Sequence, residues 1–165
     1  MSLLQTLRRA AIALLLLLVI ATPARADITA FLGATTTPDN RPSRGFALGI
    51  GLLIVGFEFE YSDTTDNTNP ATLAPALKTG TGNVLLQTPV AIAGFQPYII
   101  TGAGVYREAL GEHSDTSFTV NTGGGVKISL IGPVRLRVDY RVFKLGSGAL
   151  YSPAHRIYAG INLKL

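Results

Sequence analysis

The sequence predicts an all-β fold, an eight-stranded antiparallel up-and-down transmembrane β-barrel preceded by a cleaved signal peptide. Three observations predict it: an apolar leader, a series of segments in which apolar and polar residues alternate, and a low content of charge. Of the 165 residues, 47% are hydrophobic and 15% are charged, whereas about a quarter of a soluble domain is usually charged. The chain has 18 glycines and no cysteine, which argues against long helices, disulfides and thiolate metal sites.

The first 26 residues have the features of a secretory signal peptide. Two arginines precede an apolar stretch at residues 10–20, and Ala24-Arg25-Ala26 gives a small-x-small cleavage pattern. As a helix, this stretch would measure about 16 Å, roughly half the thickness of a bilayer core. We therefore expect cleavage after Ala26 and a single domain at residues 27–165. Without the leader the formal charge falls from +4 to +1, so the charge balance predicts no nucleic-acid partner.

Eight segments have the character of strands. In chain order they are residues 28–36, 45–51, 57–61, 80–88, 97–107, 117–130, 134–144 and 156–165. The third, sixth, seventh and eighth alternate strictly between apolar and polar residues, which is the signature of a half-buried strand. The first two are shorter and weaker, and the second alternates Phe, Leu and Ile with Ala and Gly. The fourth sets Val84 and Leu86 against Asn83 and Gln87.

The segment 97–107 is apolar on both faces, so alternation does not decide which of its faces points outward. We expect Tyr98, Ile100 and Tyr106 to point outward and Thr101 and Arg107 inward. This choice separates the two tyrosines by roughly 20 Å along the membrane normal, close to the spacing of two interfacial aromatic girdles.

The connections between these segments alternate in character. Those near residues 37–44, 63–79, 108–115 and 146–154 are long and polar, whereas those near 52–54, 89–95 and 130–132 are short and mostly apolar. Long loops at one rim and tight turns at the other are typical of outer-membrane barrels. With eight strands, both termini then lie at the periplasmic rim with the tight turns.

Alternation alone fits a soluble barrel equally well, with its valines pointing inward. Two features favour lipid on the apolar side. The opposite faces of several strands are small and almost uncharged, and the charged residues are too few to cover a soluble surface. In addition, Arg135, Arg137 and Arg141 share one face of a strand, and each would cost about 2–4 kcal/mol if it faced lipid near the midplane. The arginines are therefore expected in the lumen.

This orientation predicts three groups of functional residues. The lumen charge network is expected to contain Glu58, Glu60, Arg107, Lys127, Arg135, Arg137, Asp139, Arg141 and Arg156. The lipid-facing or girdle residues are expected to be Phe57, Phe59, Tyr61, Tyr98, Tyr106, Phe118 and Tyr140. The C-terminal insertion signal would consist of Ile161, Leu163 and Leu165. Since strands three and seven lie opposite each other in a ring of eight, Glu58 and Glu60 can pair with the arginines across the lumen.

Three stretches resemble a known family. Residues 83–89 (NVLLQTP) with 97–107 (PYIITGAGVYR), and residues 123–127 (GGGVK), resemble the fourth to sixth strands of small eight-stranded barrels of the outer-membrane β-barrel superfamily. The resemblance extends over residues 27–165. It implies an integral protein of the outer membrane of a diderm bacterium, surrounded by outer-membrane lipid and inserted by the barrel-assembly machinery. Members of this family include stability proteins and adhesins, so the resemblance does not imply a single activity.

The expected function is therefore non-enzymatic, a structural role in the envelope or a surface interaction through the loops, with no cofactor, no metal and no defined loop partner. We expect a monomer. Three alternatives remain: an interfacial lipid A-modifying enzyme that uses His113 with Ser114 or His155 with Ser152, a narrow gated channel, and a periplasmic soluble barrel that binds an apolar ligand.

Overall fold

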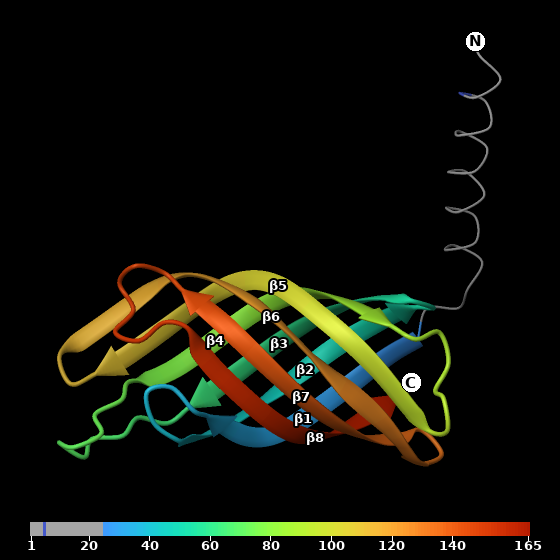
Figure 1. Cartoon of the computed structure of the whole chain (residues 1–165), viewed down its shortest axis with the longest axis horizontal. Coiled ribbons are helices and arrows are strands. Elements are labelled where there is room, and N and C mark those ends of the chain that lie inside the picture. The colour runs from blue at the N-terminus through green and yellow to red at the C-terminus, as the bar shows by residue number, and fades with distance from the viewer. Residues whose placement is uncertain (1–4, 6–24) are drawn as a thin grey trace.

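The computed structural model describes residue 5 and residues 25–165. Residues 25–165 form a closed barrel of eight strands in sequence order (Figure 1). Every neighbouring pair is antiparallel, and β8 pairs with β1 to complete the ring. The expected all-β, closed, eight-stranded antiparallel barrel is therefore confirmed. The expected signal peptide lies outside the described residues except for residues 5, 25 and 26. Among the described residues, no helix is long and apolar enough to cross a membrane.

The strands are longer than the sequence pattern predicts, and most begin or end within a few residues of the expected positions. They are β1 (Arg25–Thr35), β2 (Arg41–Leu52), β3 (Val55–Thr64), β4 (Ala76–Gln87), β5 (Phe95–Leu110), β6 (His113–Ile131), β7 (Val134–Leu145) and β8 (Ala154–Lys164).

The two ends of the barrel differ in their connections (Figure 1). At one end, which we call the turn rim, lie residues 53–54, 88–94 and 132–133 with the start of β1 and the C-terminus. At the other end, the loop rim, lie residues 36–40, 65–75, 111–112 and 146–153. The distribution of loops is the expected one, with a single exception between β5 and β6.

The expected polar loop at 108–115 is instead a two-residue turn, Gly111-Glu112, between the two longest strands. Polar residues on both sides continue the ladder, with Glu108 opposite Asp115 and Leu110 opposite His113. Pairing satisfies the backbone groups of this polar segment, and Gly111 adopts the positive φ of 59° that the tight turn requires. Residue composition therefore predicted a loop where the structure has a protruding hairpin.

The barrel is apolar outside and polar inside. On the outer face Leu32 and Phe118 are each 72% exposed and Ile99 is 62% exposed. In the lumen, Glu60, Arg137 and Arg141 are essentially unexposed. This is the opposite of a soluble barrel, in which apolar side chains fill the interior.

The orientation expected for the fifth strand was wrong. Tyr98 and Tyr106 lie in the lumen, with 4% and 1% of their surface exposed, and Arg107 lies on the outer face. Likewise, Ile100 points inward and Thr101 outward. The physical reason is that the lumen supplies hydrogen-bond acceptors, with the Tyr98 hydroxyl donating to Asp139 and the Tyr106 hydroxyl to Asp115. A girdle tyrosine would instead depend on lipid headgroups for its partner.

Small residues on the inner face make room for the large ones. A Cβ atom at Gly125 would lie 2.5 Å from the Tyr98 hydroxyl oxygen and 2.3 Å from the Val138 carbonyl oxygen. A Cβ atom at Gly123 would lie 2.9 Å from the Arg141 Cα. These glycines therefore allow the side chains of β5 and β7 to pack closely against β6.

We predict that Gly125→Leu destabilises the barrel by about 1–3 kcal/mol, because the new side chain overlaps Tyr98 and a backbone carbonyl. The matched control is Gly82→Leu, since a Cβ atom at Gly82 meets no atom within 4 Å. Urea unfolding of the folded protein in detergent measures both. Equal stability of the two variants would contradict the close packing around Gly125.

Candidate functional site

The lumen contains a network of six charged side chains and two tyrosines that crosses the barrel between opposite strands. This central network consists of Glu58, Glu60, Tyr98, Arg137, Asp139, Arg141, Arg156 and Tyr158, each at most 4% exposed. It comes from β3, β5, β7 and β8. Three carboxylates and three guanidinium groups give it a formal charge of zero.

Arg137 satisfies its three nitrogens within the network. Its Nη2 donates to Glu58 Oε1 at 3.1 Å, its Nη1 donates to Glu58 Oε2 at 2.5 Å, and its Nε donates to the Tyr98 hydroxyl at 2.7 Å. Its Nη2 also lies 3.2 Å from Asp139 Oδ2. The two parallel hydrogen bonds to Glu58 form a bidentate pair, which is the strongest geometry for these groups.

Arg141 joins the two glutamates of β3. Its Nη2 lies 3.0 Å from Glu58 Oε1 and 2.9 Å from Glu60 Oε2, and its Nε donates to Asp139 Oδ1 at 2.9 Å. The Tyr158 hydroxyl donates to Glu60 at 3.3 Å. Because one guanidinium contacts all three carboxylates, no carboxylate depends on a single partner.

Arg156 extends the network toward the loop rim. Its guanidinium donates to Glu60 and to the Ser62 hydroxyl, and its Cζ lies 4.6 Å from the centre of the Phe143 ring. The Tyr158 ring stacks on Phe31 at a centroid distance of 4.0 Å. Aromatic faces therefore cover the guanidinium where no carboxylate does, a favourable cation–π arrangement.

A second ionic cluster lies below the network at the turn rim. Asp27 Oδ2 accepts hydrogen bonds from Lys127 Nζ at 2.7 Å and from Arg135 Nη2 at 3.3 Å. Arg135 Nη1 also donates to Gln96 at 3.0 Å. These four side chains line a hollow of about 360 Å³ at the mouth of the barrel.

Above the network, the lumen contains an apolar cluster beside buried polar residues that include Arg41, Thr64 and Glu108. Leu77, Tyr106, Phe143, Leu145 and Ala154 form a buried cluster beneath the loop rim. The lumen is thus filled in three successive layers: an ionic mouth, the central network, and a top layer in which this apolar cluster, called the apolar cap, packs beside polar side chains. Filling by side chains is what the diameter of an eight-stranded barrel allows.

The structure places most of the predicted site residues on the expected face. Of the lumen set, Glu58, Glu60, Lys127, Arg135, Arg137, Asp139, Arg141 and Arg156 lie inside. Of the lipid-facing set, Phe57, Phe59, Tyr61, Phe118 and Tyr140 lie outside, as do Ile161, Leu163 and Leu165. The exceptions, described above, are Arg107, which lies outside, and Tyr98 and Tyr106, which lie inside.

Sequence reasoning missed three lumen acids: Asp115, which accepts the Tyr106 hydrogen bond, and the two discussed next, Asp27 and Glu108. Asp27 follows directly after the expected cleavage position, where no strand pattern is visible, and Glu108 lies in a segment interpreted as a loop. Both pair with basic side chains, Asp27 as described and Glu108 with His113 Nε2 at 3.2 Å. The inward position of Glu108 follows from the parity of β5 once Tyr98 is placed correctly.

The two histidines lie apart from the serines that were paired with them. The His155 Nδ1 lies 2.6 Å from the Tyr140 hydroxyl on the outer face, whereas the Ser152 hydroxyl bonds to the backbone of Leu145. His113 contacts Glu108. Within residues 25–165, no histidine–serine hydrogen bond is formed, and no group of three or more acidic or histidine side chains could hold a metal ion.

We predict that Glu58→Ala lowers the free energy of unfolding by about 3–5 kcal/mol, because Arg137 and Arg141 then carry buried charge with one partner fewer. The control is Glu112→Ala in the exposed turn between β5 and β6, where we expect a change within about 0.5 kcal/mol. The melting midpoint in detergent reports both. An unchanged midpoint for Glu58→Ala would mean that the network does not stabilise the barrel.

Solved structures of small outer-membrane barrels resemble this chain. The N-terminal β-barrel domain of Pseudomonas aeruginosa OprF has a TM-score of 0.62 at 15% identity, and the match covers 87% of this chain and 100% of that one. Neisserial surface protein A (NspA) has a TM-score of 0.63 at 16% identity over 86% and 96% of the two chains.

The attachment invasion locus protein Ail of Yersinia pestis, also studied in a phospholipid bilayer nanodisc, has a TM-score of 0.57 at 13% identity over 87% and 100% of the chains. No protein-family model and no curated protein sequence matches. The resemblance inferred from the sequence is therefore confirmed at the level of the fold: the chain has the fold of the small eight-stranded outer-membrane β-barrels.

Proposed function

We propose that this chain is an integral protein of the bacterial outer membrane, non-enzymatic and with a closed lumen, that acts through its loop rim in surface interaction or envelope integrity. The observation that carries the proposal is the inverted distribution of side chains. Apolar residues cover the outer face while buried ion pairs fill the interior. Exposing this apolar outer face to water would be unfavourable, whereas contact with hydrocarbon would carry no such cost.

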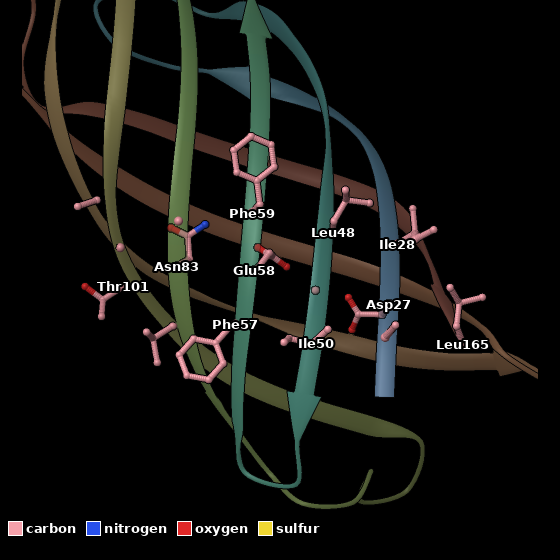
Figure 2. Close-up of a pocket in the computed structure, with 16 residues that line it drawn as sticks. Asp27, Ile28, Leu48, Ile50, Phe57, Glu58, Phe59, Asn83, Thr101 and Leu165 are labelled. Atoms are coloured by element: carbon pink, nitrogen blue, oxygen red, sulfur yellow. The ribbon is translucent and has the colours of Figure 1, made fainter. Parts of the chain in front are cut away.

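The outer face supports this proposal in detail. Figure 2 shows Leu48 and Ile50 of β2 beside Phe57 and Phe59 of β3, all lining a shallow hollow of about 800 Å³ on the barrel wall. These four side chains are 47–50% exposed. Large contiguous apolar surfaces of this kind mark contact with a membrane or a partner.

The loop rim is organised as a surface rather than as separate loops. Asn67 of the loop 65–75 donates to Asp39 of the loop 36–40 at 2.7 Å, and its backbone pairs with Ala74. Tyr151 of the loop 146–153 donates to the Leu73 carbonyl at 3.4 Å. These contacts tie three loops together beside the β5–β6 hairpin, which supports a role in binding a partner at this rim.

The interior supports a structural role over general diffusion. The central network and the apolar cap occupy the cross-section of the barrel, and the hollow at the turn rim ends beneath them. An open path for solutes would require several ion pairs to separate at once. We therefore infer that the protein is not a general porin.

A second candidate function, an interfacial lipid-modifying enzyme, has one observation in its favour. The Tyr140–His155 hydrogen bond lies on the outer face near the loop rim, where a lipid headgroup would be within reach. Mass spectrometry of lipid A from cells with and without the protein tests this candidate. A His155-dependent loss or gain of an acyl chain would establish it, and an unchanged acyl pattern would remove it.

The proposal is tested first by membrane location. Fractionation should place the folded protein in the outer membrane, and its gel mobility should change on heating, as for other stable barrels. A processed chain that stays monodisperse and folded in buffer without detergent would overturn the proposal and favour the soluble, ligand-binding alternative.

We predict that Phe59→Arg destabilises the membrane-inserted barrel by about 2–4 kcal/mol, because it places a guanidinium in the middle of the apolar band. The matched control is Phe118→Arg near the loop rim, where the cost should be about 0–1 kcal/mol. Unfolding from lipid vesicles measures the difference. Two equally small effects would mean that water surrounds the barrel.

We also predict that the wild-type protein in planar bilayers gives no steady conductance, because the paired side chains leave no continuous polar path through the lumen. A trimeric porin treated identically provides the positive control for insertion. Regular ohmic steps from the wild-type protein would contradict a closed lumen and support the channel alternative.

A further inference from the structure

The charged side chains on the outer face are confined to one end of the barrel. Within residues 25–165, the outward-facing charged residues of the strands lie toward the loop rim, and they are Arg44, Asp63, Lys78, Arg107 and Lys144. At the turn rim, Arg25 and Lys164 line the mouth of the lumen instead of the outer wall. The charge on the outer wall is therefore asymmetric along the barrel axis, with four cations and one acid toward the loop rim.

Four of these residues form a single row across neighbouring strands. Arg44 pairs with Asp63, Asp63 with Lys78, and Lys78 with Arg107, so the row crosses β2, β3, β4 and β5 without a gap. Neighbouring strands lie about 4.8 Å apart, which keeps the cations within reach of one ligand or of adjacent headgroups. The row has a net charge of +2.

The row climbs toward the loop rim because the strands are tilted. In the opposite direction from Arg44 it passes through Leu32 and Ala159 to Val138, in the middle of β7. Arg44 is thus the deepest cation of the row and Arg107 the highest.

Strand β5 gives the depth of the row relative to the membrane. Its outward residues from Phe95 to Val105 span about 33 Å along the strand and about 25 Å along the normal at a tilt near 40°, the height of the apolar band of such barrels. Arg107 is the next outward residue, about 5 Å beyond that band. This is the level of lipid headgroups, and long basic side chains extend readily toward it.

An apolar hollow ends at the deepest cation. A depression of about 780 Å³ on the outer wall is lined by Ala30, Leu32, Phe46, Tyr61, Leu136, Ala159 and Ile161, with Arg44 and Asp63 at its edge. The small side chains Ala30 and Ala159 are among its lining residues. Arg44 is 76% exposed and only 3.8 Å from Asp63, a loose pair that leaves the guanidinium free to bind another anion.

We propose that this hollow and the row of Arg44, Lys78 and Arg107 form a binding site for lipid A, the phosphorylated glycolipid of the outer leaflet. An acyl chain would lie in the hollow and a phosphate would accept hydrogen bonds from Arg44, with the two higher cations adding attraction to the same or a neighbouring headgroup. The inference rests on the proposed outer-membrane location, in which the loop rim faces the outer leaflet. The apolar hollow with a cation at its edge is complementary to lipid A, which has both apolar acyl chains and anionic phosphates.

The first experiment asks whether the phosphate matters. The folded wild-type protein in a non-ionic detergent is titrated with bisphosphorylated lipid A, with the same lipid after dephosphorylation, and with phosphatidylglycerol, and complexes are counted by native mass spectrometry. We expect the bisphosphorylated form to bind tightest. Equal binding of the dephosphorylated form would overturn the phosphate site, and equal binding of phosphatidylglycerol would overturn its assignment to lipid A.

The second experiment locates the site. Lys78→Gln should weaken binding of bisphosphorylated lipid A about fivefold, the usual effect of one basic residue near an anionic headgroup, and Lys164→Gln at the turn rim should not change it. Ala159→Phe should weaken binding by filling the hollow, whereas Gly82→Phe, in the separate hollow of Figure 2, should leave it unchanged.

Heat-modifiable gel mobility confirms that each of these variants is folded before titration. Identical affinities for Lys78→Gln and Lys164→Gln, or for Ala159→Phe and Gly82→Phe, would overturn the proposed site. A protein that inserts into bilayers but shows either result would refute this inference alone, whereas failure to insert would refute the proposed location.

Discussion

The structure depends on one electrostatic constraint: charge that cannot face the apolar surroundings of the barrel must be neutralised inside it. Three guanidinium groups and three carboxylates meet this constraint in a lumen that is almost closed to solvent. Burying either set alone would cost several kcal/mol for each ion, and pairing offsets that cost only when the geometry is good. The bidentate contact of Arg137 with Glu58 and the three-way contact of Arg141 supply that geometry.

The same constraint explains the unusual composition. Large side chains from β5 and β7 approach the inner face of β6, so β6 carries small residues at those positions. Gly123 and Gly125 of β6 fulfil this requirement where Arg141 and Tyr98 approach the backbone. The high glycine content is therefore a packing consequence of the ion pairs and not only a property of turns.

The outer face obeys a different rule. In the proposed membrane location it has to be apolar over the thickness of a bilayer, and the outward cations Arg44, Lys78, Arg107 and Lys144 are found toward the loop end alone. An arginine therefore has a different role in the lumen than on the outer wall. Arg137 of β7 points into the lumen and pairs with carboxylates there, whereas Arg107 of β5 points outward and is available to the surroundings.

The sequence alone determined the period-two pattern, the number of strands, all but one of the long and short connections, and the lumen position of Glu58, Glu60, Arg137 and Arg141. The pattern and the number of strands follow from alternation, and the lumen positions follow because period two places the three arginines of one strand on a single face. Alternation also predicted the fold that the comparisons with OprF and NspA confirm.

Only the tertiary structure decided the orientation of β5, which is apolar on both faces. Its hydrogen-bond acceptors in the lumen, Asp139 of β7 for Tyr98 and Asp115 of the neighbouring strand β6 for Tyr106, select the inward tyrosines. The extension of β5 and β6 into a hairpin was also decided there, because strand pairing satisfies a polar backbone that composition assigns to a loop. Contacts between strands supply this information, and the alternation of residues within one segment does not contain it.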